Sequence, residues 1–347
     1  MMNYTFTNKK NFLVVGRGAV AIYLALISEG VQGKKVLLPA NICYAAVFPV
    51  LLSNNIPVFC DVDKFNGNVT LSNVKNAWEE DIVAAVIPHM YGNPVVDISK
   101  IVDFAHSKGA FVIEDCASSL GAQIDKQYAG DFGDYSVFSF GHSKTIDISN
   151  GGILATNRNL EKARDFYSKL KSYSDDIAND CDFFSKIYRI IRNNSNQGWS
   201  SYIYESLAKK ADEMFLYKVD KNFEQKIEEA VVDFEKVVSK RRTQVDLYKK
   251  SIKFNEDVKE YVFEKNASPW RFNVLVEPTI RKQLISYLLK NNIPVSDWYP
   301  NVTDIFFSTK NFDGVNFMEN RILNFPLMIN EEQIKHICET FNRFFEG

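Results

Sequence analysis

Hydrophobic residues along the chain gather in short runs that are separated by segments with helical periodicity. Each run is nearly all apolar and only a few residues long, which is typical of a buried strand. The runs span residues 12–15, 36–38, 58–60, 82–87, 111–113, 137–140 and 153–155. Between several of them, apolar residues recur every three or four positions, as at residues 19–27 and 98–105. This spacing predicts helices that turn one face towards a core.

Apolar strands that alternate with helices indicate a mostly parallel sheet with helices on both faces. The pattern changes after residue 159, where charged and aromatic residues mix and residues 193–198 read as a loop. A long helix is expected over residues 223–251, then a strand at 271–276 and helices near 281–291 and 331–345. We therefore predict an α/β protein with a large domain, residues 1–240, and a smaller C-terminal α/β domain, residues 241–347.

The composition limits the classes of partner. The 347 residues include 41 basic and 43 acidic side chains, and this near balance gives no electrostatic case for nucleic acid or an anionic membrane. Five cysteines without a CxxC pair, and four scattered histidines, argue against a disulfide framework or a metal site. The first residues lack the apolar core of a signal peptide, and no stretch is apolar enough to span a membrane. A cytoplasmic protein is expected.

A glycine-rich turn follows the first expected strand and opens the first expected helix. It reads Gly16-Arg17-Gly18-Ala19-Val20-Ala21. Glycines at the start of a helix leave backbone N–H groups open to an anion, which favours a phosphate cradle. The spacing also fits a dinucleotide fingerprint, but that motif requires an acidic residue at the end of the second strand. The second strand ends in Leu38-Pro39-Ala40-Asn41. A tight strand-to-helix turn is the structural alternative.

A carboxylate and an amine follow two of the later strands. Asp115 ends the run Val112-Ile113-Glu114-Asp115, and Lys144 comes shortly after the strand that contains Ser139. In a parallel sheet, ligands bind at the carboxyl ends of the strands. Singly, Asp115 is explained by a helix cap or a salt bridge, and Lys144 by a solvated charge. Together they suit pyridoxal phosphate (PLP), because an amine can form a Schiff base with its aldehyde and a carboxylate can keep its ring nitrogen protonated.

Several motifs resemble, in order and spacing, the DegT/DnrJ/EryC1/StrS family of PLP-dependent aminotransferases. They lie at residues 114–122, 133–140, 144 and 151–152, and His89-Met90-Tyr91-Gly92 is similar to the family's His-x-Tyr-Gly segment. The similarity is strong over residues 12–157 and loose in the C-terminal third. It implies the fold type I architecture of PLP-dependent transferases, and a homodimer with each active site at the subunit interface.

The resemblance gives roles to individual residues around the cofactor. It implies that Lys144 is the Schiff-base lysine and that Asp115 faces the pyridine nitrogen. It also implies that the phosphate is bound by the hydroxyl of Ser139 and by the backbone N–H groups of Gly18 and Ala19.

Other positions of the resemblance concern the cofactor ring and the partner subunit. Ser118 stands near the cofactor's phenolic oxygen, where the family usually carries Gln. The aromatic residue that stacks on the ring falls on Cys43 by strict count and on Tyr44 after a shift of one residue. Asn222 opens the segment Asn222-Phe223-Glu224, which corresponds to the family's Asn-Tyr-Arg motif from the partner subunit without its basic residue.

The implied reaction moves an amino group from an amino acid, glutamate by family analogy, to a keto sugar that is often linked to a nucleotide. Products of this kind enter surface-polysaccharide or secondary-metabolite biosynthesis. Residues 159–220 match the family poorly. The candidates for substrate contact are His142, His89 and Tyr91. Packing is the alternative role of His142.

Two other functions fit parts of the sequence. A PLP-dependent dehydratase or lyase acting on a related sugar would use the same cofactor, although relatives that dehydrate a keto sugar generally carry His in place of the lysine. An NAD-dependent oxidoreductase would instead use the glycine-rich turn at residues 16–21. Lys144 argues against the dehydratase.

Overall fold

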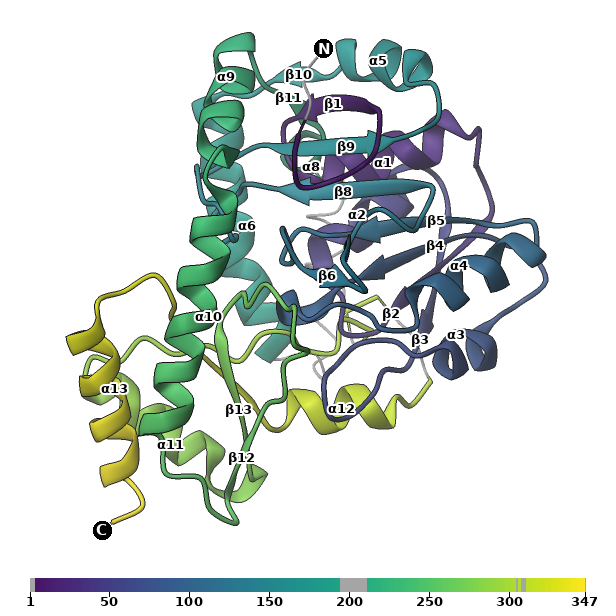
Figure 1. Cartoon of the computed structure of the whole chain (residues 1–347). Coiled ribbons are helices and arrows are strands. Elements are labelled where there is room, and N and C mark those ends of the chain that lie inside the picture. The colour runs from purple at the N-terminus through teal and green to yellow at the C-terminus, as the bar shows by residue number, and fades with distance from the viewer. Residues whose placement is uncertain (1–3, 194–210, 304, 307–309, 347) are drawn as a thin grey trace.

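The computed structural model describes residues 4–193, 211–303, 305–306 and 310–346. Its centre is a seven-stranded sheet in the order β1-β9-β8-β5-β4-β2-β3, which Figure 1 shows with helices on both sides. The strands are β1 (Asn11–Val15), β2 (Lys35–Pro39), β3 (Ile56–Cys60), β4 (Ile82–Pro88), β5 (Phe111–Asp115), β8 (Tyr135–Ser139) and β9 (Gly152–Thr156). Strands β3, β2, β4, β5 and β8 run parallel, and β9 is antiparallel to β8 and β1. The predicted mostly parallel sheet between helices is confirmed.

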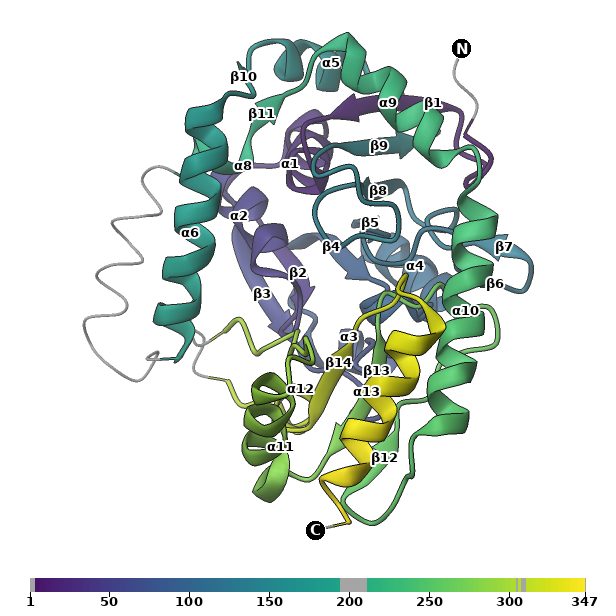
Figure 2. The ribbon, with the colours of Figure 1, turned by 90° about the vertical axis from the view of Figure 1, so that its left-hand side faces the viewer.

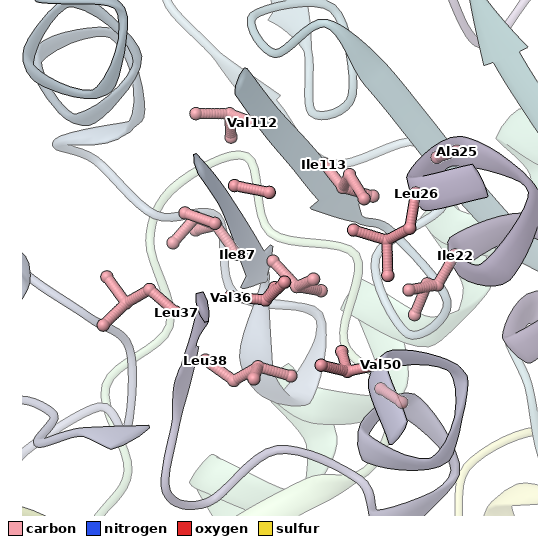
Figure 3. Close-up of a cluster of buried hydrophobic side chains, with 14 of the residues drawn as sticks. Ile22, Ala25, Leu26, Val36, Leu37, Leu38, Val50, Ile87, Val112 and Ile113 are labelled. Atoms are coloured by element: carbon pink, nitrogen blue, oxygen red, sulfur yellow. The ribbon is translucent and has the colours of Figure 1, made fainter. Parts of the chain in front are cut away.

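Helices in the connections between strands bury apolar faces against this sheet. They are α1 (Gly18–Ser28), α2 (Tyr44–Leu52), α3 (Leu71–Ala77), α4 (Ile98–Ser107) and α5 (Glu161–Ser168). In Figure 3, Ile22 and Leu26 of α1 and Val50 of α2 point towards the strands near Val36 and Ile113. All five side chains are buried. Burial of one such side chain stabilises a fold by about 1.5–3 kcal/mol, so this layer fixes where α1 and α2 begin.

A second, smaller sheet lies in the C-terminal part of the chain, at the bottom of Figure 1. Its antiparallel strands are β12 (Val258–Glu260), β13 (Phe272–Val276) and β14 (Ile322–Phe325). The helices α11 (Pro278–Lys290) and α13 (Glu331–Arg343) pack on it and share one hydrophobic core with it. The expected strand and helices of this region are present, with ends that differ by a few residues.

The single helix expected over residues 223–251 is wrong, because the structure has two helices there. They are α9 (Lys221–Val231) and α10 (Phe234–Ser251). Helix α9 ends before Val232, whose side chain is exposed, and α10 begins after Asp233. Val231 and Phe234, on either side of the break, enter the same buried cluster, while Val232 between them stays exposed.

The remaining elements are short or lie at the edge of the large sheet. Figure 2 shows α6 (Asp175–Asn193) as an upright helix outside α1 and α2. The others are η1 (Met90–Gly92), β6 (Gln123–Ile124), β7 (Gln127–Tyr128), β10 (Lys171–Ser172), α8 (Ala211–Phe215), β11 (Tyr217–Lys218) and α12 (Asp313–Glu319). The loop expected at residues 193–198 lies almost wholly outside the described residues. Within the described part of the chain, no helix is long and apolar enough to cross a membrane.

The C-terminal part of the chain returns to the large sheet before it completes the small one. The N–H of Val302 donates to the carbonyl of Ala40, just after β2, over 2.9 Å. The carboxylate of Asp61 accepts the N–H groups of Gly314 and Val315 at the start of α12, each over 3.0 Å. These contacts carry the residues near position 299 to the carboxyl edge of the sheet.

Gly92 is the point where the end of β4 meets the segment that leads into β13. Its φ is +84°, and an added Cβ would lie 1.9 Å from the carbonyl oxygen of Ser268. The N–H of Ser268 donates to the Gly92 carbonyl over 2.8 Å, and the N–H of Trp270 donates to the Tyr91 carbonyl over 2.9 Å. This close backbone approach requires a residue without a side chain.

Replacing Gly92 with Ala should therefore lower the free energy of unfolding by about 3 kcal/mol, because the left-handed backbone and the clash with Ser268 add. Gly109→Ala is the matched control, since Gly109 has a φ of +75° with nothing within 4 Å of its added Cβ. It should cost about 1 kcal/mol. Chemical denaturation measures both. Equal losses in the free energy of unfolding would show that the backbone at Ser268 moves away from the added Cβ at no cost.

Candidate active site

The candidate residues gather at the carboxyl edge of the large sheet. β5 ends at Asp115 and the neighbouring parallel strand β8 ends at Ser139, with Asp115 paired to Val137 in the register. Helix α1 begins at Gly18, and an added Cβ there would lie 3.7 Å from Ser139 Oγ. Three segments far apart in the sequence thus meet where ligands bind in open α/β sheets.

Lys144 reaches the same edge from the irregular segment between β8 and β9. Its Nζ lies 3.4 Å from the Oγ of Ser118. The charge of Asp115 acts on this amine, and the charge of Lys144 acts in turn on Asp115. The structure therefore brings Lys144, Asp115 and Ser118 together in one pocket.

Asp115 is a buried carboxylate with capacity left for a ligand. Its Oδ1 accepts the N–H of Ala117 over 2.9 Å, and no residue in the described ranges donates a hydrogen bond to its Oδ2. Burial raises the pKa of Asp115, although the positive charge of Lys144 works in the opposite direction. A cationic N–H donor placed against Oδ2 would satisfy this oxygen and favour the ionised carboxylate.

The surroundings of Lys144 favour the charged form of its amine. Burial alone would lower its pKa, but the negative charges that Tyr299, Cys43 and Asp115 can carry outweigh burial, and the pKa of Lys144 is raised above its usual value. The sequence analysis had only the resemblance to place an amine here. The geometry adds that this amine must lose a proton before it can act as a nucleophile.

Gly18, Ser139 and Gly141 surround a place suited to a phosphate. Added Cβ atoms on Gly18 and Gly141 would approach Ser139 Oγ to 3.7 and 3.8 Å, so side chains there would fill the space beside the hydroxyl. Ser139 Oγ forms no hydrogen bond with any described residue. The first N–H groups of α1, at Gly18 and Ala19, lack acceptors within the helix, as in every α-helix. Hydroxyl and N–H groups in this arrangement are donors for an anion.

The structure separates Cys43 from Tyr44, the alternatives for the residue against the cofactor ring. Cys43 is within electrostatic reach of both Lys144 and Asp115. The ring of Tyr44 instead stacks on Tyr188 of α6, with 4.0 Å between centroids. Cys43 therefore faces the pocket, and Tyr44 belongs to an aromatic cluster beside it.

His89 does not reach the pocket, which corrects the expectation that it contacts substrate. Its side chain is fully buried, and both ring nitrogens are engaged. Nδ1 accepts the N–H of Val95 over 3.0 Å, so the proton lies on Nε2, which donates to Glu114 Oε2 over 3.0 Å. Burial acts to raise the pKa of Glu114, but this bond and the N–H groups of Gly133 and Gly130 lower it overall. The pair anchors the chain beneath β5.

The other expected contacts lie outside the pocket. Tyr91 is fully buried, and its hydroxyl accepts the N–H of Tyr299 over 3.2 Å, so it positions a residue of the pocket and cannot touch substrate. The side chain of His142 is 90% exposed, beside Asp147 at 3.5 Å, so it does not face the pocket and does not pack in the core either. Asn222 is exposed on the first turn of α9, away from the residues around Lys144.

The sequence analysis missed Tyr299. This residue is 7% exposed, its hydroxyl interacts with the side chain of Ser118, and the charges of Lys144 and Asp115 act on it. It comes from the loop before α12, more than 150 positions after Lys144. A lone Tyr between Trp298 and Pro300 has no local pattern that would mark it.

Arg241 and Trp270 hold the backbone of the lysine segment, and they were also missed. The Arg241 guanidinium donates to the carbonyls of Lys144 (3.2 Å), Thr145 (3.1 Å), Pro269 (3.2 Å) and Trp270 (2.9 Å). The indole N–H of Trp270 donates to the carbonyl of Ser143 over 2.6 Å. Burial lowers the pKa of Arg241 to about 10, and the residue is 6% exposed. On an amphipathic helix the periodicity alone would leave this arginine in solvent.

Comparison with known proteins decides what this pocket belongs to. The model of the DegT/DnrJ/EryC1/StrS aminotransferase family matches residues 4–181. The chain belongs to this family. It is an aminotransferase, and its cofactor is pyridoxal phosphate, as the resemblance implied. The oxidoreductase that would read the glycine-rich turn as a dinucleotide site is thereby set aside.

Three individual proteins show how far the similarity extends. GDP-perosamine synthase of Escherichia coli O157:H7 is 27% identical over an alignment 347 positions long, gaps included. The alignment covers 95% of this chain and 85% of that protein. The UDP-N-acetyl-3-dehydro-alpha-D-glucosamine 3-aminotransferase of Acidithiobacillus ferrooxidans is 34% identical over 43% of this chain and 40% of its own. The crystal structure of NtdA from Bacillus subtilis with bound cofactor PMP has a TM-score of 0.72 at 17% identity, over 98% of this chain and 74% of that chain. This last likeness shows the fold type I architecture.

The residues present fit the cofactor of the family. Asp115 offers a carboxylate oxygen without a donor, and Lys144 offers an amine in the same pocket. Ser139, next to the start of α1, offers a hydroxyl that bonds to none of the residues that the structure describes. The donors and the acceptor are thus the types that the phosphate, the aldehyde and the ring nitrogen of PLP require.

Replacing Arg241 with Gln should lower the free energy of unfolding by about 3 kcal/mol, because buried carbonyls on two segments lose a charged donor. The control is Arg242→Gln on the same helix, since Arg242 is less buried and donates to the carbonyls of Ala267 and Asn266 alone. That change should cost about 1 kcal/mol. Urea denaturation measures both, and equal losses would contradict a special role of Arg241.

Proposed function

We propose that this aminotransferase moves an amino group from an amino acid, most simply glutamate, to a keto sugar linked to a nucleotide, with Lys144 as the lysine that holds PLP. The observation that carries the proposal is that Lys144, Asp115 and Ser139 gather at the carboxyl edge of the large sheet. Relatives named for a GDP-linked amino sugar and for a UDP-linked keto sugar support the class of acceptor. Surface-polysaccharide or secondary-metabolite biosynthesis would consume such a product.

Each group of the cofactor has a counterpart in the pocket. Lys144 would hold the aldehyde carbon through its amine, and Asp115 would accept the ring N–H on Oδ2. Ser139 and the N–H groups of Gly18 and Ala19 would donate to the phosphate. Hydrogen bonds to a charged group contribute about 1.5–3 kcal/mol each.

Bound in this way, PLP supplies a carbonyl that accepts amino groups and a ring that draws electrons from the carbon that loses its proton. The chain supplies the proton transfer. When its amine is free, Lys144 Nζ takes the proton from the substrate carbon that carries the nitrogen. It can return this proton to the carbon on the other side of the same nitrogen. Asp115 stays ionised and keeps a proton on the ring nitrogen, while Ser118 and Tyr299 orient the amine through their hydroxyls.

Further parts of the proposal concern the surroundings of the pocket. Cys43 would lie against the cofactor ring in place of the aromatic residue usual in the family. Asn222, exposed on α9, would complete the pocket of the other protomer in a homodimer. All five cysteines are free, which supports a reducing compartment such as the cytoplasm.

We also propose that the large and small domains divide near residue 240, within α10. Val238 packs in a cluster with residues of the large sheet, whereas Val245 packs in the core of the small sheet. Helix α12 and the residues before it belong with the large domain, since they bond to Ala40 and Asp61.

Lys144→Ala should abolish covalent attachment of PLP, because no other lysine among the described residues is brought to Asp115. Borohydride reduction followed by mass spectrometry of the intact protein measures the adduct. The control Lys162→Ala removes an exposed lysine of α5 and should leave attachment and the conversion of glutamate to 2-oxoglutarate intact. An adduct that persists in the Lys144 variant would rule out the assignment, and failure of the wild type to release 2-oxoglutarate would favour a dehydratase or lyase.

The rate at which the cofactor-free protein attaches PLP should rise with pH, about tenfold per unit between about pH 7 and 9. The pKa of Lys144 is raised, so its amine is protonated over this range, and only the neutral fraction, which grows tenfold per unit, attacks an aldehyde. Stopped-flow absorbance at a fixed PLP concentration measures the rate. A rate that is flat over the same range would mean that the amine is already neutral in the pocket.

A further inference from the structure

Arg17 is a cation of the pocket that neither the motifs nor the proposed function uses. It directly precedes Gly18 at the start of α1 and does not cap the helix with its side chain. Its Nη1 donates to the carbonyl of Met214 over 3.0 Å and lies 3.8 Å from Cys181 Sγ. The guanidinium carbon sits 4.9 Å from the ring centroid of Phe215. The side chain is therefore fixed by α6 and α8, at the border of the site.

The guanidinium lacks an anionic partner among the described residues. No carboxylate there forms an ion pair with it, and its Nε and Nη2 donate to no described residue. Both atoms retain access to solvent, unlike Nε of Arg241, which is fully enclosed without a partner. The side chains whose charge would act on it most are Tyr217, Cys181, Tyr44 and Cys43. All four are neutral near pH 7.

Arg17 is half-buried and has no counter-ion among the described residues. Removing a charge from bulk water is costly unless an opposite charge or hydrogen bonds replace the solvent. A guanidinium has five N–H donors in a planar fork that matches phosphate and carboxylate oxygens. Here only Nη1 is occupied, so the remaining donors form a preset half-site for an oxyanion.

Two observations place this half-site beside the cofactor and not elsewhere on the surface. Arg17 and Gly18 are consecutive, so the guanidinium and the first N–H groups of α1 border the same turn. The positive charge of Arg17 also acts on Lys144 and Cys43, where it works to lower the pKa of each. The guanidinium is therefore within electrostatic reach of the lysine.

We propose that Arg17 binds the phosphate group of PLP and supplies the positive charge that the cradle of Gly18, Ala19 and Ser139 lacks. This inference rests on the proposed function, because it needs PLP on Lys144. The cradle offers only neutral donors and the partial charge of a helix end to a group that carries nearly two negative charges. A charge-assisted bond from Nε or Nη2 would bind the phosphate more tightly than the cradle alone.

The test compares two ligands that differ only in the phosphate. Apoprotein of the wild type, Arg17→Gln and Arg17→Lys is titrated with PLP and with pyridoxal, and the visible absorbance of the lysine-bound cofactor gives each dissociation constant. Arg17→Gln should weaken PLP binding about 10- to 100-fold, the equivalent of one charged hydrogen-bonding interaction, and leave pyridoxal binding unchanged. Arg17→Lys should lose less, because it keeps the charge without the fork.

The matched control is Arg164→Gln. Arg164 also donates to a main-chain carbonyl, that of Phe12 over 2.7 Å, but it lies on the exposed side of α5. It should change neither dissociation constant. Circular dichroism checks that each variant is folded, and Arg17→Lys keeps the test valid if Arg17→Gln does not fold.

Three results would overturn the proposal and leave Lys144 as the cofactor lysine. The first is unchanged PLP binding in Arg17→Gln with an unchanged KM for a nucleotide-linked keto sugar. The second is an equal loss of binding for PLP and pyridoxal. The third is unchanged PLP binding with a raised KM for the nucleotide-linked keto sugar. The last result would assign Arg17 to the diphosphate of the substrate. If the wild type itself takes up neither PLP nor pyridoxal, the proposed function fails, so the two failures are distinguishable.

Discussion

The buried guanidinium of Arg241 is the contact on which the position of the candidate lysine depends. The segment that carries Lys144 has no regular secondary structure, so no ladder of hydrogen bonds fixes its path. Arg241 instead donates to the carbonyls of residues 144 and 145 and, on the other side, to those of 269 and 270. Because the fork of donors is planar and rigid, it sets the distance between the two segments. The amine is therefore held by a residue of the helix that connects the two cores.

This arrangement ties the chemistry to the C-terminal part of the chain. The pocket receives Asp115 and Ser139 from the large sheet, but Tyr299 reaches it from the loop before α12. The position of that loop is set by the hydrogen bond from the Val302 N–H to the Ala40 carbonyl. It is also set by the Asp61 carboxylate, which accepts the first N–H groups of α12. If the small sheet moved, α10 and its residue Arg241 would move with it and displace the Lys144 carbonyl to which Arg241 donates. The site therefore depends on residues from the C-terminal part of the chain as well as on the large sheet.

The sequence could predict the parts of the site that follow a local rule. A carboxylate that ends an apolar run, and glycines between a strand and a helix, have fixed positions in a parallel sheet, so Asp115 and Gly18 could be placed before the fold was known. Arg241 and Tyr299 follow no such rule, since their partners are backbone and side-chain groups distant in the sequence, from 28 positions away for Pro269 to 97 for Lys144 in the case of Arg241. His89 failed for the opposite reason. It lies in a family motif, but its ring nitrogens are satisfied inside the protein by Glu114 and Val95.

The helices that surround Arg17 lie mostly beyond the part of the chain that the family model matches. Helices α6 and α8 begin after residue 159, where the pattern of the sequence changes, and they supply the Met214 carbonyl, Cys181 and Phe215 around the guanidinium. The same two helices take up the ring of Tyr44, which leaves the smaller Cys43 facing Lys144. An unusual arginine before Gly18, a thiol against the pocket and a divergent pair of helices are therefore one structural feature. The aromatic rings that α6 and α8 contribute lie against both the guanidinium of Arg17 and the ring of Tyr44.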